Sequence, residues 1–179
     1  MGYVADKFST IIPVTAFGHS AGTWTTTVAS NVWYTRRTAA DAAATTYVPL
    51  GHAPQRDGAT KGAQLESVEF HFRISSAAID AMEAHLYKAT LAADGSLLTV
   101  AEVTTTYDAG HDTAAERIDT DEHLMTLTPS TPFYLDAAEM LFLEVVYDGS
   151  AAGVIDEFLA KANWTWRLDR KSTRLNSSH

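Results

Sequence analysis

The stretch Glu66–Ile74 reads Glu-Ser-Val-Glu-Phe-His-Phe-Arg-Ile and alternates between apolar and polar side chains. Val68, Phe70, Phe72 and Ile74 fall at every second position, and charged or polar residues fill all three positions between them. Successive side chains of a β-strand point to opposite faces of its sheet, so this period of two predicts a strand with one buried face. We therefore expect an antiparallel strand that covers half of a core.

Two other stretches extend this pattern. Leu141–Tyr147 reads Leu-Phe-Leu-Glu-Val-Val-Tyr and is apolar at nearly every position, which predicts a central strand packed between layers. Ala162–Leu168 alternates again and places Trp164 and Trp166 on the same face of a last strand.

Weaker patterns complete the expected fold. They predict further strands at Ile11–Phe17, Trp24–Val28, Val32–Thr35, Thr46–Leu50, His85–Leu91, Leu97–Tyr107 and His123–Leu127. Short helices are expected at Thr38–Ala44, Ala77–Ala84 and Ile155–Ala160. Short strands without intervening helices of about 10 to 15 residues are typical of an all-β fold. The sequence thus predicts an antiparallel β-sandwich of the jelly-roll type with few short helices.

The 179-residue chain has a length that suits a single domain with a sizeable core. We expect residues 1–37 to form an N-terminal arm or the first strands, and residues 38–168 to form the β-sandwich domain. The remaining residues, Asp169–His179, resemble a translated sequencing adapter, because all eleven codons can be written to match one. We expect this tail to be non-native and to extend as coil, with the natural end of the chain at or beyond Leu168.

The charge balance narrows the range of partners. The chain has 13 basic and 22 acidic residues and a net charge of −9, and removal of the tail leaves 10 and 21, a net charge of −11. Because nucleic-acid affinity depends on basic side chains that neutralise phosphates, the sequence predicts no direct nucleic-acid binding. We also expect no membrane partner, since no run approaches the roughly 20 apolar residues of a membrane span. The chain has no cysteine, which excludes disulfides, thiolate nucleophiles and Cys-ligated zinc.

The segment Gly18–Gly22 reads Gly-His-Ser-Ala-Gly, the Gly-x-Ser-x-Gly pattern of the nucleophile elbow in lipases and esterases. Such an elbow needs a strand before the serine and a helix after it. Only seventeen residues precede Gly18, and the residues from Thr23 to Val28 are strand-like. We therefore interpret the segment as a turn between strands. A hydrolase that uses Ser20 as its nucleophile is kept as an alternative hypothesis.

The segment His111–His123 contains two histidines and five carboxylates, which are ligands for a divalent ion. Asp119 and Asp121 have the spacing found in calcium loops, but the segment lacks the glycine and the terminal glutamate of an EF-hand. It also lacks a zinc-type His-x-x-x-His pair. A solvated acidic loop is the favoured interpretation, with Arg117 paired to a neighbouring carboxylate, and an ion site is the alternative.

Other candidate residues carry weaker signals. His71 and His85 lie in predicted strands with no assignable acid or base partner. The four tryptophans would form a sugar-stacking platform if exposed, but we expect them in the core: Trp24, Trp33, Trp164 and Trp166. We expect no catalytic residue, no cofactor and no bound metal.

Several short runs resemble β-sandwich proteins encoded near the structural genes of tailed phages. They are Gly62–Phe70, His85–Thr90, Thr128–Leu135 and Leu141–Val145, and the resemblance spans roughly Tyr47 to Trp166. It implies a non-enzymatic virion component, such as a capsid, decoration or fibre-type protein. Such a protein would be located in the virion, would assemble as a homo-oligomer and would contact other virion proteins. The alternative is a carbohydrate-binding jelly-roll module whose partner is a glycan.

Overall fold

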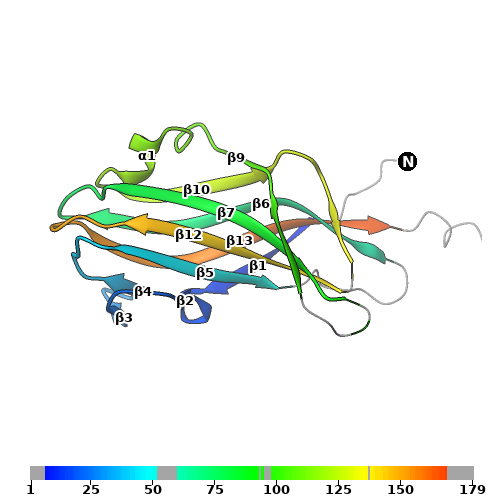
Figure 1. The fold of residues 1–179 in the computed structure, drawn as a ribbon, viewed down its shortest axis with the longest axis horizontal. Helices are drawn as coiled ribbons and strands as arrows, with labels where there is room; N and C mark the ends of the chain where they lie inside the picture. Colours follow the sequence, from blue (N-terminus) through cyan, green and yellow to red (C-terminus); the bar gives the residue numbers. More distant parts are fainter. Residues whose placement is uncertain (1–6, 52–59, 93, 95–97, 137, 169–179) are drawn as a thin grey trace, which may run out of the picture.

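Two antiparallel sheets face each other in the computed structural model of this chain (Figure 1). The larger sheet has the strand order β3-β4-β13-β6-β10-β9, and in addition β1 pairs with β13 and β11 pairs with β6. The smaller sheet has the order β2-β5-β12-β7-β8. The predicted antiparallel β-sandwich is thus confirmed.

The structure describes residues 7–51, 60–92, 94, 98–136 and 138–168. The larger sheet is built from β1 (Lys7–Pro13), β3 (Trp24–Ala29), β4 (Val32–Arg37), β6 (Thr60–Ser75), β9 (Thr105–Tyr107), β10 (Glu122–Pro129), β11 (Tyr134–Leu135) and β13 (Val154–Leu168). The smaller sheet is built from β2 (Gly18–His19), β5 (Ala43–Gly51), β7 (Ala81–Thr90), β8 (Thr99–Val103) and β12 (Glu139–Asp148). The described residues also form two short helices, the 3-10 helix η1 (Val14–Ala16) and α1 (Ala114–Ile118).

The core lies between the sheets and follows the alternation that the sequence predicts. Val68, Phe70 and Phe72 of β6 are fully buried, and so are Leu141 and Leu143 of β12 on the opposite sheet. Each such side chain stabilises the fold by about 1.5 to 3 kcal/mol through removal of apolar surface from water.

The centre of the smaller sheet differs from the expectation. β12 is central, with β5 and β7 on either side, but only its inward face is fully buried. Phe142, Glu144 and Val146 on the outward face are half-buried. No helix of the described chain lies over this face, which is turned toward the viewer in Figure 1. The expectation that β12 packs between two layers is therefore wrong, and the apolar side chains on its outer face need another explanation.

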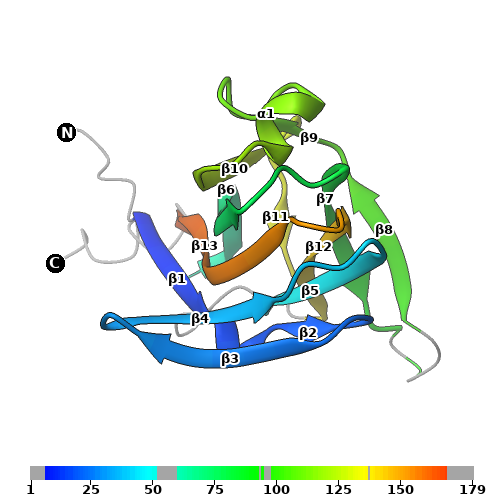
Figure 2. The same cartoon turned by 90° about the vertical axis from the view of Figure 1, so that its left-hand side faces the viewer.

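The two sheets contact each other at the long edges of the sandwich in two ways (Figure 2). At one edge, His19 of β2 stacks on Trp24 of β3 with ring centroids 4.1 Å apart. At the other edge, the chain leaves β8 in the smaller sheet and enters β9 in the larger sheet after the single residue Thr104. The predicted strand Leu97–Tyr107 is thus two strands in two sheets.

The three predicted helices are wrong. Thr38–Ala44 ends within β5, Ala77–Ala84 ends within β7, and Ile155–Ala160 lies inside β13. The last segment forms a strand because β6 pairs with one of its edges while β4 and β1 pair with the other. The predicted strand Ile11–Phe17 ends early, because β1 ends at Pro13 and η1 begins at Val14.

The described N-terminal residues, Lys7–Arg37, form four paired strands, with β2 in the smaller sheet and the other three in the larger one. They do not extend away as an arm. The adapter-like tail, Asp169–His179, lies outside the described residues. Among the residues described, no helix has the length and apolar character to span a membrane.

Candidate ligand-binding face

The outer face of the smaller sheet carries one aromatic side chain on each of three adjacent strands. They are Tyr47 of β5, Phe142 of β12 and Tyr87 of β7. Tyr47 is 40% exposed, and the other two are half-buried. Met140 and Val100 add exposed apolar surface on either side of Ala89. Because this surface is not used to build the core, it is available to a ligand.

Strand register fixes the arrangement of the aromatic residues. Phe142 pairs directly with Tyr87, and their rings stack with centroids 5.2 Å apart. Glu144 lies between Tyr47 and His85, since it pairs with both. Gly18 of β2 lies opposite Tyr47 and contributes no side chain on that flank. The result is an apolar patch with a carboxylate in its middle and an open side next to Tyr47.

Electrostatics keep the Tyr87 hydroxyl in its neutral form. Burial raises the pKa of Tyr87, and the nearby carboxylates of Glu144 and Glu102 raise this pKa further. The hydroxyl therefore stays a hydrogen-bond donor across the physiological range.

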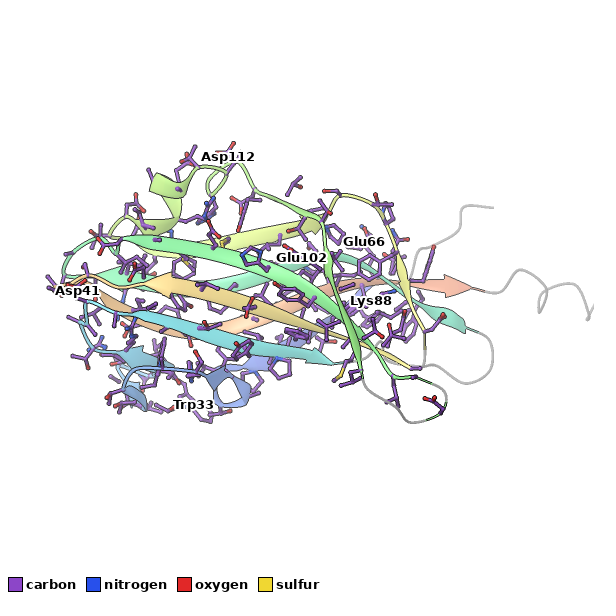
Figure 3. All side chains as sticks on the ribbon, in the orientation of Figure 1. Trp33, Asp41, Glu66, Lys88, Glu102 and Asp112 are labelled. Carbon is purple, nitrogen blue, oxygen red and sulfur yellow. The ribbon has the colours of Figure 1, made fainter. Side chains whose placement is uncertain are left out.

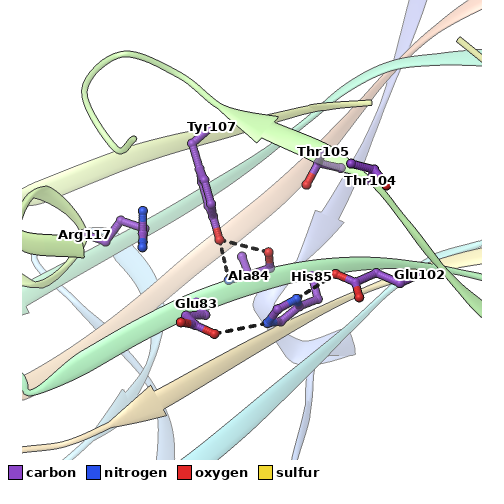
Figure 4. Close-up of a pocket in the computed structure, with 8 residues that line it drawn as sticks. All are labelled: Glu83, Ala84, His85, Glu102, Thr104, Thr105, Tyr107 and Arg117. Carbon is purple, nitrogen blue, oxygen red and sulfur yellow. Dashed lines mark hydrogen bonds and ion pairs between the residues drawn. The ribbon is translucent and has the colours of Figure 1, made fainter. Parts of the chain in front are cut away.

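A pocket of about 560 Å³ adjoins this face at the edge of β7 (Figure 4). His85 stands at its centre, with Nδ1 2.9 Å from Oε1 of Glu102 and Nε2 3.5 Å from Oε2 of Glu83. The side chains of Thr104 and Thr105 line the same pocket. The pocket thus presents carboxylates, hydroxyls and an imidazole, which are groups that bind polyhydroxylated ligands.

The inner wall of the pocket is fixed by two side chains from the other sheet and from α1. Tyr107 of β9 hydrogen-bonds to both backbone groups of Ala84. The buried guanidinium of Arg117 donates to the carbonyls of Met82 (3.0 Å) and His111 (2.8 Å) and lies 4.5 Å from the Tyr107 ring centre. Both side chains bind the edge of β7 and hold the pocket wall rigid.

The Gly-x-Ser-x-Gly segment forms β2 and the turn after it. The Ser20 hydroxyl accepts a hydrogen bond from the Thr45 amide (3.1 Å). His19 is adjacent in sequence, but its Nε2 lies 2.8 Å from Oε2 of the fully buried Glu157. Gly22 adopts φ +83°, and a Cβ there would lie 2.9 Å from Nε of Arg37. The glycine therefore permits a turn, and no contact among the described residues places a base on Ser20.

The acidic segment His111–His123 folds around α1. Thr113 caps this helix and exchanges hydrogen bonds with Glu116 in a capping box. His111 lies between Asp108 (2.9 Å) and His123 (3.2 Å). Arg117 donates to backbone carbonyls and not to the expected carboxylate. Within the described ranges, no three or more His, Asp or Glu side chains form a group that could hold a metal ion.

Burial opposes the ionisation of Asp108, yet its pKa is lowered, because the Thr126 amide, His111 and the Gly110 amide hydrogen-bond to this carboxylate. The carboxylate therefore has a structural role, in which it joins the loop to β10.

The tryptophans do not form a platform. Trp164 is buried, and Trp24 and Trp166 pack partly against the core. The core position expected for Trp33 is wrong, because this side chain is 52% exposed (Figure 3). Trp164 and Trp166 share a face as predicted, since Phe8 stacks on both.

The two candidate histidines, His71 and His85, lie on different sheets. His71 lies on the larger sheet, where burial lowers its pKa, while His85 belongs to the pocket described above. The sequence analysis did not identify Tyr47, Phe142 and Tyr87 as candidate site residues. Phe142 nevertheless lies at one of the alternate positions that face outward, where a half-exposed strand normally has polar residues. This excess of apolar residues in β12 was the available signal.

Comparison with known proteins gives no family. No protein-family profile and no curated protein matches this chain. One similar solved structure is described as a carbohydrate-binding module from the β-sandwich superfamily. It has 14% identity and a TM-score of 0.37, and the match covers 92% of this chain and 58% of that chain. The xylan-binding module CBM86 from Roseburia intestinalis has 10% identity and a TM-score of 0.37, over 92% and 98% of the two chains.

A carbohydrate esterase from the Shiga toxin-encoding bacteriophage phi24B has 13% identity and a TM-score of 0.39, over 85% and 91% of the two chains. Other similar structures are longer, and this chain spans only 28% of the one described as the Agl-KA catalytic domain. These similarities are too low to carry a functional argument, so function has to be inferred from the surface itself.

Proposed function

We propose that this protein is a non-catalytic carbohydrate-binding module that holds a glycan on the outer face of its smaller sheet. The observation that carries the proposal is the cluster of Tyr47, Phe142 and Tyr87 across three adjacent strands, with Glu144 among them. Adjacent strands lie about 4.8 Å apart, so the three rings span a short run of an extended ligand.

Sugars combine apolar C–H faces with a rim of hydroxyl groups. Aromatic side chains offer rigid apolar area with little loss of side-chain entropy, and carboxylates accept hydrogen bonds from hydroxyl groups. Tyr47 and the stacked Phe142–Tyr87 pair supply the apolar contacts. Glu144 and the Glu102–His85 pair supply the hydrogen-bonding contacts, and the pocket beside them has room for further hydroxyl contacts.

The charge of the face favours a neutral glycan. Glu83, Glu102 and Glu144 lie on it or at its border, and the whole chain has a net charge of −9. A sulfated or uronic-acid glycan would be repelled by these carboxylates. The expected ligands are therefore uncharged oligosaccharides or polysaccharides.

The test is calorimetric titration of the full chain with neutral xylo-, galacto- and cello-oligosaccharides, after a glycan array has ranked them. For the best ligand, Tyr47→Ala should weaken binding at least about tenfold, equivalent to about 1.4 kcal/mol. Trp33→Ala is the matched control, because Trp33 is also an exposed aromatic residue but belongs to the larger sheet.

Two outcomes would contradict the proposal. One is an array on which no neutral glycan binds. The other is a bound glycan whose affinity is insensitive to Tyr47→Ala and to Phe142→Ala. The virion role expected from the sequence resemblance stays a prediction, and mass spectrometry of purified virus-like particles checks it, since missing peptides would count against it.

A further inference from the structure

The strand β3 (Trp24–Ala29) forms one end of the larger sheet and lies at the lower border of the molecule in both ribbon views (Figures 1 and 2). Among the residues that the structure describes, it pairs with β4 along one edge and with no strand along the other. Its other edge exposes backbone amide and carbonyl groups that can pair with an additional strand.

The hairpin that carries this edge is well defined. Ser30 and Asn31 connect β3 to β4, and both have positive φ, at 52° and 64°. Two consecutive residues of this kind form the tight turn whose twist matches that of paired strands. Thr26 and Thr35 also join the two strands through their hydroxyls at 2.9 Å. The free edge of β3 is therefore held in an extended, strand-like form.

Proteins normally protect such an edge with charges, prolines or very short strands. The other outer strands follow this rule, as β1 contains Lys7 and Pro13, β8 contains Glu102, and β2 and β9 are only two and three residues long. The unpaired part of β7 is covered by Tyr107 and Arg117. In contrast, β3 has six residues and contains no charged residue, no proline and no glycine.

Exposed apolar side chains gather at the same hairpin. Val28 is 66% exposed, Val32 is 45% exposed and Trp33 is 52% exposed, and Val28 pairs directly with Trp33. Large apolar side chains concentrated at one place mark a binding surface more often than scattered ones do. The unprotected edge and the apolar patch therefore point to the same contact.

We propose that β3 of one molecule pairs antiparallel with β3 of a second copy of this chain, so that the larger sheets of both copies become continuous. Charge does not oppose a second copy at this place. Two molecules with a net charge of −9 each repel one another over most of their surface, but they can approach where neither contributes a charged side chain. Threonine and valine also suit cross-strand pairs with themselves.

A twofold axis through the centre of β3 pairs residues that lie equally far from the axis, so one end of each strand lies opposite the other end of its partner. Thr26 or Thr27 then lies next to its own counterpart, depending on the register. Val28 of each copy then lies opposite the Trp24–Thr26 stretch of the other copy. The glycan-binding face belongs to the smaller sheet, so it stays open on both copies.

The first test is sedimentation velocity of the full chain over a range of concentrations. A dimer is expected, and Val28→Lys should weaken it at least about tenfold, because a lysine on an edge strand disfavours pairing of that edge with another strand. The matched control is Leu124→Lys on β10, since Leu124 is 47% exposed and lies elsewhere on the same sheet. The control should dimerise like the natural sequence.

The second test uses the absence of cysteine in the chain. Thr26→Cys and Thr27→Cys are made one at a time, and at least one should form a covalent dimer under mild oxidation much faster than Leu124→Cys. A monomer at all concentrations would overturn the proposal. A dimer that withstands Val28→Lys, or equal crosslinking by all three cysteine variants, would overturn it as well.

Discussion

The Tyr107 hydroxyl accepts a hydrogen bond from the Ala84 amide at 2.9 Å and donates one to the Ala84 carbonyl at 3.0 Å. Tyr107 belongs to β9 in the larger sheet, whereas Ala84 belongs to β7 in the smaller one. A single side chain thus takes the place of a neighbouring strand where β8 has already turned away.

We expect Tyr107→Phe to lower the free energy of unfolding by about 1 to 3 kcal/mol, because two buried backbone groups lose their partner while the ring stays in place. Urea denaturation measures the change. Tyr47→Phe is the control, since its hydroxyl lies on an exposed side chain, and it should alter stability by less than about 0.5 kcal/mol. Equal stability of all three proteins would contradict this role of Tyr107.

The buried Glu157 predicts an alkaline limit of stability. Its Oε1 accepts hydrogen bonds from Tyr147 (2.7 Å) and Thr46 (2.6 Å). Burial, followed by the charge of Glu157, raises the pKa of Tyr147 well above its usual value. Because the folded state favours the protonated phenol, this contribution is complete below about pH 10 and is lost as the pH rises further.

Stability measured from pH 8 to pH 11 should therefore fall more steeply in the natural sequence than in Tyr147→Phe. At neutral pH, Tyr147→Phe itself should be less stable by about 1 to 3 kcal/mol, since Glu157 loses a buried donor. Identical slopes in both proteins would show that Tyr147 does not limit alkaline stability.

The acid limit depends on Asp156. Burial disfavours its charged form, but hydrogen bonds from Arg36 (2.6 Å and 2.8 Å) and Arg73 (3.1 Å and 2.5 Å) outweigh this effect and lower its pKa. A lowered carboxylate pKa stabilises the fold above about pH 4, and this stabilisation is lost as the pH falls through the folded-state pKa.

Asp156→Asn should reduce stability at pH 7 by about 1 to 3 kcal/mol and flatten the pH dependence below pH 4. Thermal unfolding between pH 2 and pH 7 checks both effects. Asp112→Asn is a suitable control, because Asp112 is exposed. An unchanged acid slope in Asp156→Asn would argue against this assignment.

Gly18 allows the glycan site to be blocked without loss of the fold. A Cβ at this position would lie 3.9 Å from both the Cβ and the carbonyl oxygen of Tyr47, which is ordinary contact. Gly18→Leu should leave the melting temperature nearly unchanged, yet it covers the open flank of Tyr47. Glycan affinity should fall by about tenfold or more, equivalent to about 1.4 kcal/mol. An unchanged affinity would place the ligand elsewhere.

Alternation predicted the strands because it records which side chains meet the core. Glu66–Ile74 and Ala162–Leu168 both lie in strands of the larger sheet, as expected. The helix expected at Ile155–Ala160 does not form, because the local pattern of this segment does not determine its structure. Its apolar and acidic residues fit a helical period locally, but pairing with strands far away in sequence determines the structure.

The candidate site was harder to find. Tyr47, Tyr87 and Phe142 are far apart in sequence and become neighbours only through strand order, which no local pattern contains. The motifs that looked informative, Gly18–Gly22 and His111–His123, have structural roles as a turn and as a capped helix. For locating the candidate site, the motifs with potentially catalytic or metal-binding residues were thus less useful than the excess of apolar residues in β12.

The place of β13 in the larger sheet has a consequence for synthesis of the chain. β13 is the last described strand, yet it pairs with β1, β4 and β6, so these strands lack their central partner until the ribosome has made it. All strands of the smaller sheet have been made by Asp148. That sheet can form first, with Leu141, Leu143 and Val145 still facing water. Folding through such distant pairings is slow, and the nascent protein is most prone to aggregation in the interval before β13 emerges.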